Sequence, residues 1–385
     1  MNTKHPRLYA IVLLAVSLGS ALLIVWQWTE ALQAAEEVSL TADITPVVKN
    51  RPELILQKKK MKPAKREAKG LYLTAYSAGN IGTVDKIIDL MDRTELNAVV
   101  IDIKDYSGKV LYDSNLLMVN TLKTEENRIG DLGALIKKFH EHDIYVIARQ
   151  TVFQDPILAE RKPEWAIKSK KGGLWRDNLG LAWVDPTEQG VWRYNVALTK
   201  EAIRLGFDEI NFDYVRFPSD GNISLVVYSN GAQKRHEIMK AFFSYLDEQL
   251  SDLPAWISID MFGFVMERYD GMSIGQRLED AVDYVDYISP MMYPSHYPTG
   301  HLGLANPAEH PAAVIDNGMK KGIGFFQDKR AKLRPWIQAF HLGAYYDADK
   351  IRAEIDTVEQ YTKGGWLLWN AANRYTEAGL KIDSP

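Results

Sequence analysis

The sequence has no cysteine among its 385 residues. Disulfide bonds, thiolate catalysis and cysteine-ligated zinc are therefore excluded, whereas either side of a membrane stays compatible with the chain. A basic excess is missing too, because the formal net charge at pH 7 is −4. Proteins that bind nucleic acids by neutralising phosphates carry such an excess, so we expect no nucleic-acid partner.

Several motifs of cofactor-dependent and metal-dependent enzymes are also missing. No G-x-G-x-x-G or Walker sequence follows the first expected strand, which counts against nucleotide binding. No H-E-x-x-H, His-x₃-His or EF-hand spacing occurs, and no G-x-S-x-G elbow of a serine hydrolase. We therefore expect neither a cofactor nor a metal site.

The N-terminus contains an uncharged, largely apolar run over residues 8–28, after a tail with Lys4 and Arg7. About 21 helical residues at roughly 1.5 Å each give roughly 31 Å, enough to cross a bilayer. Trp26 suits the membrane interface near the outer end of this run. We expect residues 1–28 to form a tail and an uncleaved signal anchor, rather than a cleavable signal peptide, with the bulk of the chain outside the cytoplasm.

Residues 29–68 are expected to form a flexible linker. They contain several prolines, and a basic run, KKKMKPAKREAK, covers residues 58–69. Such a run is usually a solvated tether, and the alternative is that it attracts anionic lipid or an anionic wall polymer.

From residue 70 onward, short apolar strands alternate with amphipathic helices. Strands are expected over 70–76, 97–105, 144–153, 209–217, 256–263, 287–294, 334–341 and 364–370. Helices are expected over 85–96, 131–140, 188–205, 233–251, 274–284, 311–322 and 349–365. Eight strands separated by helices call for a parallel sheet, so we predict the α/β class and a closed (β/α)₈ TIM barrel over residues 69–385. An open doubly wound sheet is the alternative.

Two carboxyl groups stand near the expected ends of neighbouring strands, Asp213 on the fourth and Asp260 on the fifth. The active site of such a barrel lies at the C-terminal ends of its strands. Glycoside hydrolysis needs two carboxyl groups that flank the bond, one as acid and one as nucleophile or base. We predict that Asp213 and Asp260 are catalytic. Their spacing is not encoded in the pattern, so a retaining and an inverting reaction both stay open.

Further polar and aromatic residues near these strand ends are candidates for substrate binding. They are Tyr76, Asp102, Arg149, Trp183, Arg216, Tyr293, His296, His341 and Trp369. Arg149 and Arg216 could hold a carboxylate ionised or bind an anionic group of the substrate. The structural alternative is a layer of ion pairs that ties strand ends together, in which Asp102 would be the buried partner of Lys104 or Arg149.

The segment WVDPT, residues 183–187, has a second interpretation as a helix start. Asp185 would be the N-cap and Pro186 the first helical residue, with Trp183 left to line a sugar subsite. His296 and His341 likewise have the alternative of being ordinary surface histidines.

The motifs GLYLTAY, AVVIDIKDYSGKVLYDS, IYVIARQTVFQD, WVDPT, GFDEINFDYVRFPSDG, SIDMFG, YISPMMYPSHY and GGWLLWN occur in this order. With them the chain, from about Lys69 to Asp383, resembles a bacterial family called the putative glycosyl hydrolase domain, a (β/α)₈ group related to amylase-type glycosidases. The resemblance implies a nucleophile at the end of strand four, which falls on Asp213. It also implies an acid at the end of strand five, where amylases carry Glu and this chain has the shorter Asp260.

These patterns together predict a membrane-anchored, extracytoplasmic glycoside hydrolase that acts on a polysaccharide of the cell wall, capsule or biofilm. The alternative is an envelope protein that binds glycans without turnover. Carboxyl groups far beyond about 10 Å apart, or one of them locked in a buried ion pair, would favour the binding protein. Deacetylase or lyase chemistry has less support, since metal ligands are missing and no motif indicates a lyase.

Overall fold

The computed structural model describes residues 61–229, 231 and 234–382. The predicted anchor over residues 8–28 and most of the predicted linker lie outside these residues. Within the described part, no helix is both long and apolar enough to cross a membrane. The described end of the predicted linker, residues 61–67, lies against the barrel, where Lys62 Nζ is 3.2 Å from Asp286 Oδ2.

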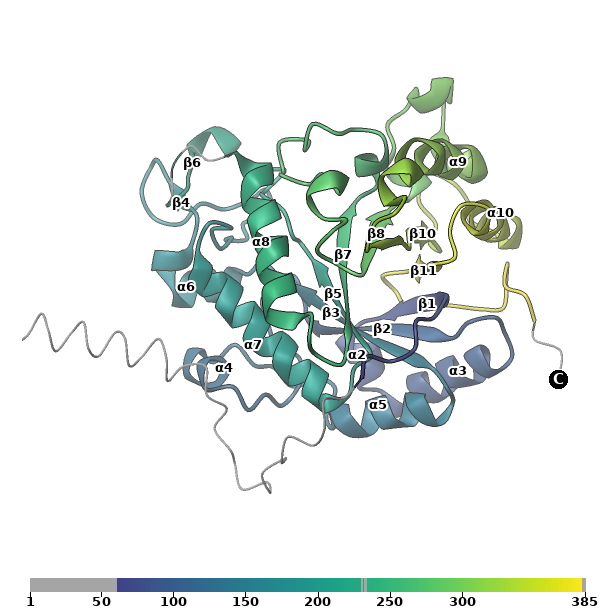
Figure 1. Cartoon of the computed structure of the whole chain (residues 1–385), viewed down its shortest axis with the longest axis horizontal. Helices are drawn as coiled ribbons and strands as arrows, with labels where there is room; N and C mark the ends of the chain where they lie inside the picture. The colour runs from purple at the N-terminus through teal and green to yellow at the C-terminus, as the bar shows by residue number, and fades with distance from the viewer. Residues whose placement is uncertain (1–60, 230, 232–233, 383–385) are drawn as a thin grey trace, which may run out of the picture.

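Parallel strands form a closed barrel surrounded by helices (Figure 1). The strands are β1 Ala68–Leu73, β2 Ala98–Lys104, β3 Tyr145–Thr151, β5 Glu209–Asp213, β7 Trp256–Phe262, β8 Tyr287–Met291, β9 Lys332–Leu333, β10 Trp336–Gln338 and β11 Gly365–Trp369. Their order is β10-β11-β1-β2-β3-β5-β7-β8-β9, and β10 also pairs with β8 and so closes the ring. Strands β9 and β10 share the seventh position, separated at Pro335, which has no N–H to donate. The predicted (β/α)₈ barrel is confirmed.

Helices follow most strands and cover the outside of the barrel (Figure 1). The longer ones are α3 Ile81–Asp92, α5 Leu132–Glu141, α7 Gln189–Leu205, α8 Arg235–Leu250, α9 Pro311–Gly322 and α10 Ala348–Glu359. Shorter elements are α2 Ala75–Ala78, α4 Leu117–Leu122, α6 Pro156–Arg161 and the 3₁₀ turns η1 Pro163–Trp165, η2 Ile223–Leu225, η3 Gly263–Met266, η4 Leu278–Asp280, η5 Pro294–His296, η6 His301–Gly303, η7 Pro307–Glu309 and η8 Ile323–Phe326. A small hairpin pairs β4 Lys168–Ser169 with β6 Val226–Val227.

The helix expected over residues 274–284 is wrong. This segment contains only the 3₁₀ turn η4 among irregular turns. Met272, Ser273 and Gly275 all have positive φ, which a right-handed helix does not allow. In addition, the buried Gln276 accepts a hydrogen bond from the amide of Phe262 at 2.9 Å, so its side chain ties the segment to the end of β7.

The strands end one to four residues earlier than the patterns predict, and β5 and β1 show a local reason. Strand β5 stops at Asp213 because Tyr214 has φ 53°, a left-handed conformation that breaks the ladder. Strand β1 stops at Leu73, and Thr74 caps α2 by accepting a hydrogen bond from the amide of Ser77. Tyr76 therefore lies on a short helix and not at a strand end.

The predicted helix start at Asp185 is also corrected. Helix α7 begins at Gln189, with Glu188 at its N-cap position. Asp185 Oδ1 instead accepts a hydrogen bond from the amide of Thr187 at 2.9 Å, and its Oδ2 accepts one from the amide of Ser229 at 2.7 Å. Asp185 thus joins the chain before α7 to the loop after β6.

The barrel interior is apolar in its middle. Ala68, Ala98, Val100, Ile147 and Leu367 lie there, separate from the larger apolar layer between strands and helices. Gly70 belongs to the same level, because a Cβ at this position would meet Leu367 Cδ2 at 2.7 Å. Large side chains on one strand are thus matched by small ones on the next, which closes the interior to water.

A buried ion pair closes the N-terminal end of the barrel. Arg334, between β9 and β10, donates from Nη1 to both carboxylate oxygens of Glu209 at 2.8 Å. The two side chains are 0% and 1% exposed. Tyr145 donates its hydroxyl to Glu209 at 3.0 Å, and the Arg334 guanidinium lies 3.6 Å from the ring centroid of Tyr287.

We expect Arg334→Met to lower the free energy of unfolding by roughly 3–5 kcal/mol, because Glu209 would stay buried without its cation. Urea denaturation at neutral pH measures this loss. Lys332→Met, at an exposed neighbouring position, is the matched control and should change stability by less than about 0.5 kcal/mol. Equal losses in the two variants would contradict the assigned role of the pair.

Candidate active site

Four charged side chains meet inside the C-terminal end of the barrel. Asp102 comes from β2, Arg149 from β3, Asp213 from β5 and Asp260 from β7. The parallel register aligns Asp102 with Arg149 and Thr151 with Asp213, and alternate residues of a strand point to the same face. Each of the four side chains is at most 8% exposed.

Arg149 contacts all three carboxyl groups. Its Nη1 donates to Asp102 Oδ1 at 2.6 Å, its Nη2 donates to Asp213 Oδ2, and its Nε lies 3.9 Å from Asp260 Oδ2. Burial lowers the pKa of Arg149, but the charges of Asp102 and Asp213 outweigh this effect and raise that pKa well above its ordinary value. The site therefore has a permanent cation in its centre.

Asp260 differs from Asp213 in its surroundings. Its Oδ1 accepts hydrogen bonds from Asn211 Nδ2 at 2.9 Å and from Trp336 Nε1 at 2.8 Å. Burial, and then the neighbouring charge of Asp213, raise the pKa of Asp260 well above its ordinary range. Asp213, in contrast, accepts hydrogen bonds from Arg149 and from the amide of Tyr214 at 2.6 Å.

Asp102 is the buried partner of Arg149, and it also accepts a hydrogen bond from the hydroxyl of Tyr72. Burial raises the pKa of Asp102 despite the opposing charge of Arg149. Lys104 is not its partner, because the fully buried Lys104 Nζ lies 2.8 Å from Asp155 Oδ2. Asp102 therefore lies behind the guanidinium and holds its orientation.

Aromatic rings line one side of the site. Tyr72 and Trp369 stack with ring centroids 4.1 Å apart, and Trp336 meets Trp369 edge-on at 5.5 Å. The Arg149 guanidinium lies 5.1 Å from the ring centroid of Trp369. Tyr293, which is 6% exposed, lies 6.5 Å from Trp369 and continues the wall. Aromatic faces of this kind suit sugar rings as well as a barrel core.

Tyr293 connects the carboxyl groups to a loop at the rim. Burial, and next the charges of Asp260 and Asp213, raise its pKa well above the ordinary value. His296, an exposed residue of the same loop, has its ring 5.3 Å from that of Tyr293 and 6.0 Å from that of Phe340. The structure thus brings His296 to the rim and Tyr293 to the carboxyl groups.

Arg216 and Trp183 form a second layer beside the carboxyl groups. The Arg216 guanidinium lies 5.0 Å from the ring centroid of Trp183 and 5.1 Å from that of Tyr214. Its Nη1 donates to the carbonyl of Phe217 at 3.1 Å, and burial lowers its pKa. Trp183 is only 1% exposed, so it supports Arg216 from beneath.

Two of the predicted binding residues lie away from this centre. Tyr76 is 57% exposed, and its ring faces the guanidinium of Arg128 at 4.7 Å. His341 is exposed in the loop after β10, where its ring stacks on Tyr345 at 4.5 Å. No hydrogen bond or ion pair joins either side chain to Asp213 or Asp260.

The sequence reasoning missed Tyr72 and Trp336. Both side chains point into the barrel. Tyr72 donates a hydrogen bond to Asp102, and Trp336 donates one to Asp260. The alternation in GLYLTAY could have indicated Tyr72, since it shares a face with Gly70. Trp336 follows a proline in a broken strand, which hides its alternation. Among the described residues, no group of three or more acidic or histidine side chains is arranged to hold a metal ion.

A family model described as "Putative glycosyl hydrolase domain" matches residues 70–375, which span the barrel from β1 to beyond β11. The chain belongs to this family. No curated protein matches the chain.

Two solved structures share the fold of this chain, and a third is similar in sequence over about half of it. The glycoside hydrolase domain of PgaB (BpsB) from Bordetella bronchiseptica is 12% identical, with 81% of this chain and 95% of that chain covered and a TM-score of 0.58. An α-galactosidase from Thermus thermophilus is 10% identical over 81% of this chain and 60% of that chain, with a TM-score of 0.50. A hypothetical protein from Ruminiclostridium thermocellum ATCC 27405 is 40% identical over 49% of this chain and 96% of that chain, with a TM-score of 0.47.

We expect Arg149→Met to lower the free energy of unfolding by roughly 3–5 kcal/mol at neutral pH, because three buried carboxyl groups would lose their common cation. The deficit should shrink as the pH falls, since protonation of Asp102 and Asp260, whose pKa values are already raised, removes the unpaired charge. Urea denaturation at two pH values measures this change.

The matched control is Arg216→Met. Arg216 is also buried, but no carboxylate of the described residues lies within ion-pair distance of it. Its deficit should depend less on pH over the same range, because the carboxylates that act on Arg216 lie beyond ion-pair distance. A pH-independent loss in Arg149→Met would contradict the central role of this cation.

Proposed function

We propose that this protein is a glycoside hydrolase in which Asp213 is the nucleophile or base and Asp260 donates the proton. The observation that carries the proposal is the different environment of two neighbouring carboxyl groups. Asp213 is paired with Arg149, whereas burial and the charge of Asp213 raise the pKa of Asp260. A pair of carboxyl groups whose environments differ in this way can supply the acid and the base of glycosidic cleavage.

A carbohydrate substrate is supported by the aromatic wall beside the carboxyl groups and by membership of the family. Tyr293 and Trp369 are placed to contact a sugar ring, while Arg149 holds Asp213 in position. His296 lies at the rim, where it could meet a second ring. The reaction needs two carboxyl groups and water, and no cofactor.

A protein that binds glycans without turnover is the second candidate. The observation in its favour is the buried ion pair between Asp213 and Arg149, since a carboxylate held in this way is less free to attack. The two candidates share the aromatic wall and differ in turnover, so hydrolysis by matched variants separates them.

We expect Asp260→Asn to slow hydrolysis of an unactivated glycan by roughly 10²–10⁴-fold, because the leaving oxygen loses its proton donor. A p-nitrophenyl glycoside of the same sugar needs little protonation, so its hydrolysis should slow much less. Asp213→Asn should abolish hydrolysis of both substrates while glycan binding persists. Release of reducing sugar and of nitrophenol measures the two reactions.

The control for these variants is Asp220→Asn, at an exposed aspartate in the loop after β5, which should keep its activity. Unchanged turnover in Asp213→Asn would refute the catalytic assignment. Absence of hydrolysis in the unaltered protein across a broad panel of envelope and exported polysaccharides, with glycan binding retained, would favour the binding protein.

The pH dependence of the stability of Asp260→Asn tests independently whether the folded protein favours the protonated form of Asp260. The folded state favours protonated Asp260, whereas the unfolded carboxyl ionises near about pH 3.9. The unaltered protein should therefore lose stability as the pH rises above that value. A neutral asparagine has no such loss, so the stability of Asp260→Asn relative to the unaltered protein should rise from pH 4 to pH 7.

We further propose that residues 1–28 anchor the protein in the cell membrane by a single span, with the barrel on the extracytoplasmic side. The support is the apolar run over residues 8–28 and the basic tail before it. The full chain should stay with membranes after alkaline carbonate extraction. A chain that lacks residues 1–28 should be released, and release of the full chain would refute the anchor.

A further inference from the structure

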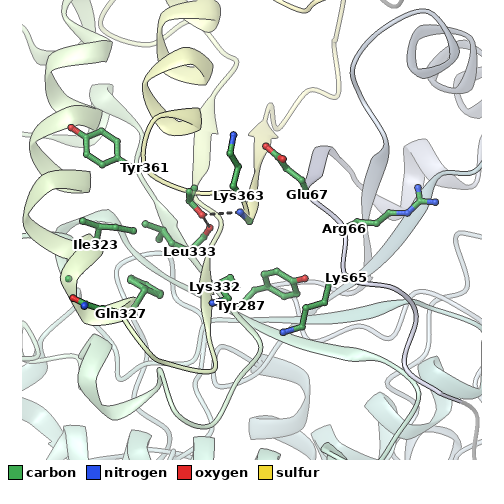
Figure 2. Close-up of a pocket in the computed structure, with 14 residues that line it drawn as sticks. Lys65, Arg66, Glu67, Tyr287, Ile323, Gln327, Lys332, Leu333, Tyr361 and Lys363 are labelled. Atoms are coloured by element: carbon green, nitrogen blue, oxygen red, sulfur yellow. Dashed lines mark hydrogen bonds between the residues drawn. The ribbon is translucent and has the colours of Figure 1, made fainter.

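A cavity of about 570 Å³ lies at the N-terminal end of the barrel, away from the carboxyl groups of the candidate active site (Figure 2). Its walls come from residues 65–67 before β1, residues 323–327 after α9, Lys332 and Leu333 of β9, and residues 361–364 before β11. Strands β1, β9 and β11 all begin here, so the cavity opens on the face opposite to the mouth.

Three of its lysines have no carboxylate partner among the described residues. Lys65, Lys332 and Lys363 are exposed around the cavity, and none has a carboxylate oxygen within 4.0 Å (Figure 2). Other lysines of this end are paired, as Lys62 is with Asp286 and Lys69 with Glu95 and Glu359. Glu67 is the one acidic residue in the lining, so the cavity keeps an excess of positive charge.

Helix dipoles explain only part of this excess. Helices α9 and α10 end at this face, and a lysine near a helix C-terminus is favourable without any ligand. Lys363 follows α10 closely and fits that explanation. Lys65, however, lies on the extended chain before β1, and Lys332 begins a strand.

Arg334 contacts two residues of the cavity lining from inside the barrel, but it does not itself line the cavity. Arg334 Nε donates to the carbonyl of Gly364 at 2.9 Å, and its guanidinium covers the ring of Tyr287. Gly364 and Tyr287 both line the cavity. Lys65 Nζ lies 4.9 Å from the ring centroid of Trp256. Lys332 and Lys363 border the cavity without a carboxylate partner among the described residues, and this border is suited to an anion.

The chain reaches the barrel at this same face. Residues 61–67 lie beside the cavity, and they follow the lysines at positions 58–60 and the apolar run over 8–28. We infer that the cavity binds the phosphate group of an anionic lipid headgroup, so that the N-terminal end of the barrel rests on the membrane and the mouth points away. This inference relies on the proposed anchor and is independent of hydrolysis.

The test uses the full chain in nanodiscs of phosphatidylcholine alone or with one-third phosphatidylglycerol. Hydrogen exchange of residues 323–327 and 361–364 should be several-fold slower in the anionic nanodiscs at low salt. The difference should vanish near 1 M salt, where the Debye length is about 3 Å. Lys332→Glu with Lys363→Glu should abolish the difference. Lys86→Glu with Lys171→Glu changes the net charge equally at exposed sites elsewhere and should preserve it.

Equal exchange in the two nanodiscs, or equal effects of the two double variants, would overturn the inference. Slowing by inorganic phosphate in neutral nanodiscs, without further slowing by anionic lipid, would overturn the assignment to a headgroup. The anchor is scored separately by co-purification with neutral nanodiscs. Co-purification without lipid dependence refutes the cavity alone, whereas loss of co-purification refutes the anchor and the docking that relies on it.

Discussion

The arrangement of the mouth depends on a single guanidinium. Arg149 is the cation that Asp102, Asp213 and Asp260 share, and it lies at the centre of strands β2, β3, β5 and β7. Several buried carboxyl groups without a cation would be too costly to keep in a barrel interior. Because two of them take the close hydrogen bonds, the third, Asp260, is left at 3.9 Å with neutral donors around it. The geometry around one guanidinium therefore gives Asp213 and Asp260 different hydrogen-bond partners.

The N-terminal end of the barrel also contains a buried arginine, but this arginine pairs with a single carboxylate. Arg334 Nη1 donates to both carboxylate oxygens of Glu209, and Tyr145 donates a further hydrogen bond to this carboxylate. The lower pair is one cation with one anion, so its charge is balanced. The cluster around Arg149 has three carboxyl groups for one guanidinium, and the charge of Asp213 raises the pKa of Asp260. Both sites are buried, so the excess of carboxyl groups over guanidinium groups is what distinguishes the candidate active site from the structural ion pair.

The strand order and the position of Asp213 and Asp260 could be predicted from the sequence. Both follow from patterns within short segments, namely the alternation of side chains along a strand and the succession of strands and helices. The hydrogen-bond donors of Asp260 could not all be predicted, since Trp336 on β10 reaches Asp260 on β7 only once the ring has closed. Local conformations also escaped detection. The left-handed Tyr214 shortens a strand, and the positive φ of Gly275 lies within the segment 274–284, where turns replace the expected helix. The pairing of Lys104 with Asp155 likewise depends on a loop that no periodicity describes.

The seventh strand position has a consequence for the protonation of Asp260. Strand β8 pairs with β9 only through Tyr287 and Ile288, and with β10 only at Trp336, so the ring has a weakly laddered seam. Segments with few ladder bonds open at lower free energy than the rest of a fold. Trp336 lies on that seam and is also the indole that holds Asp260. Local opening of this seam would therefore remove the indole hydrogen bond that lowers the pKa of Asp260, and so favour the protonated form of this carboxyl group.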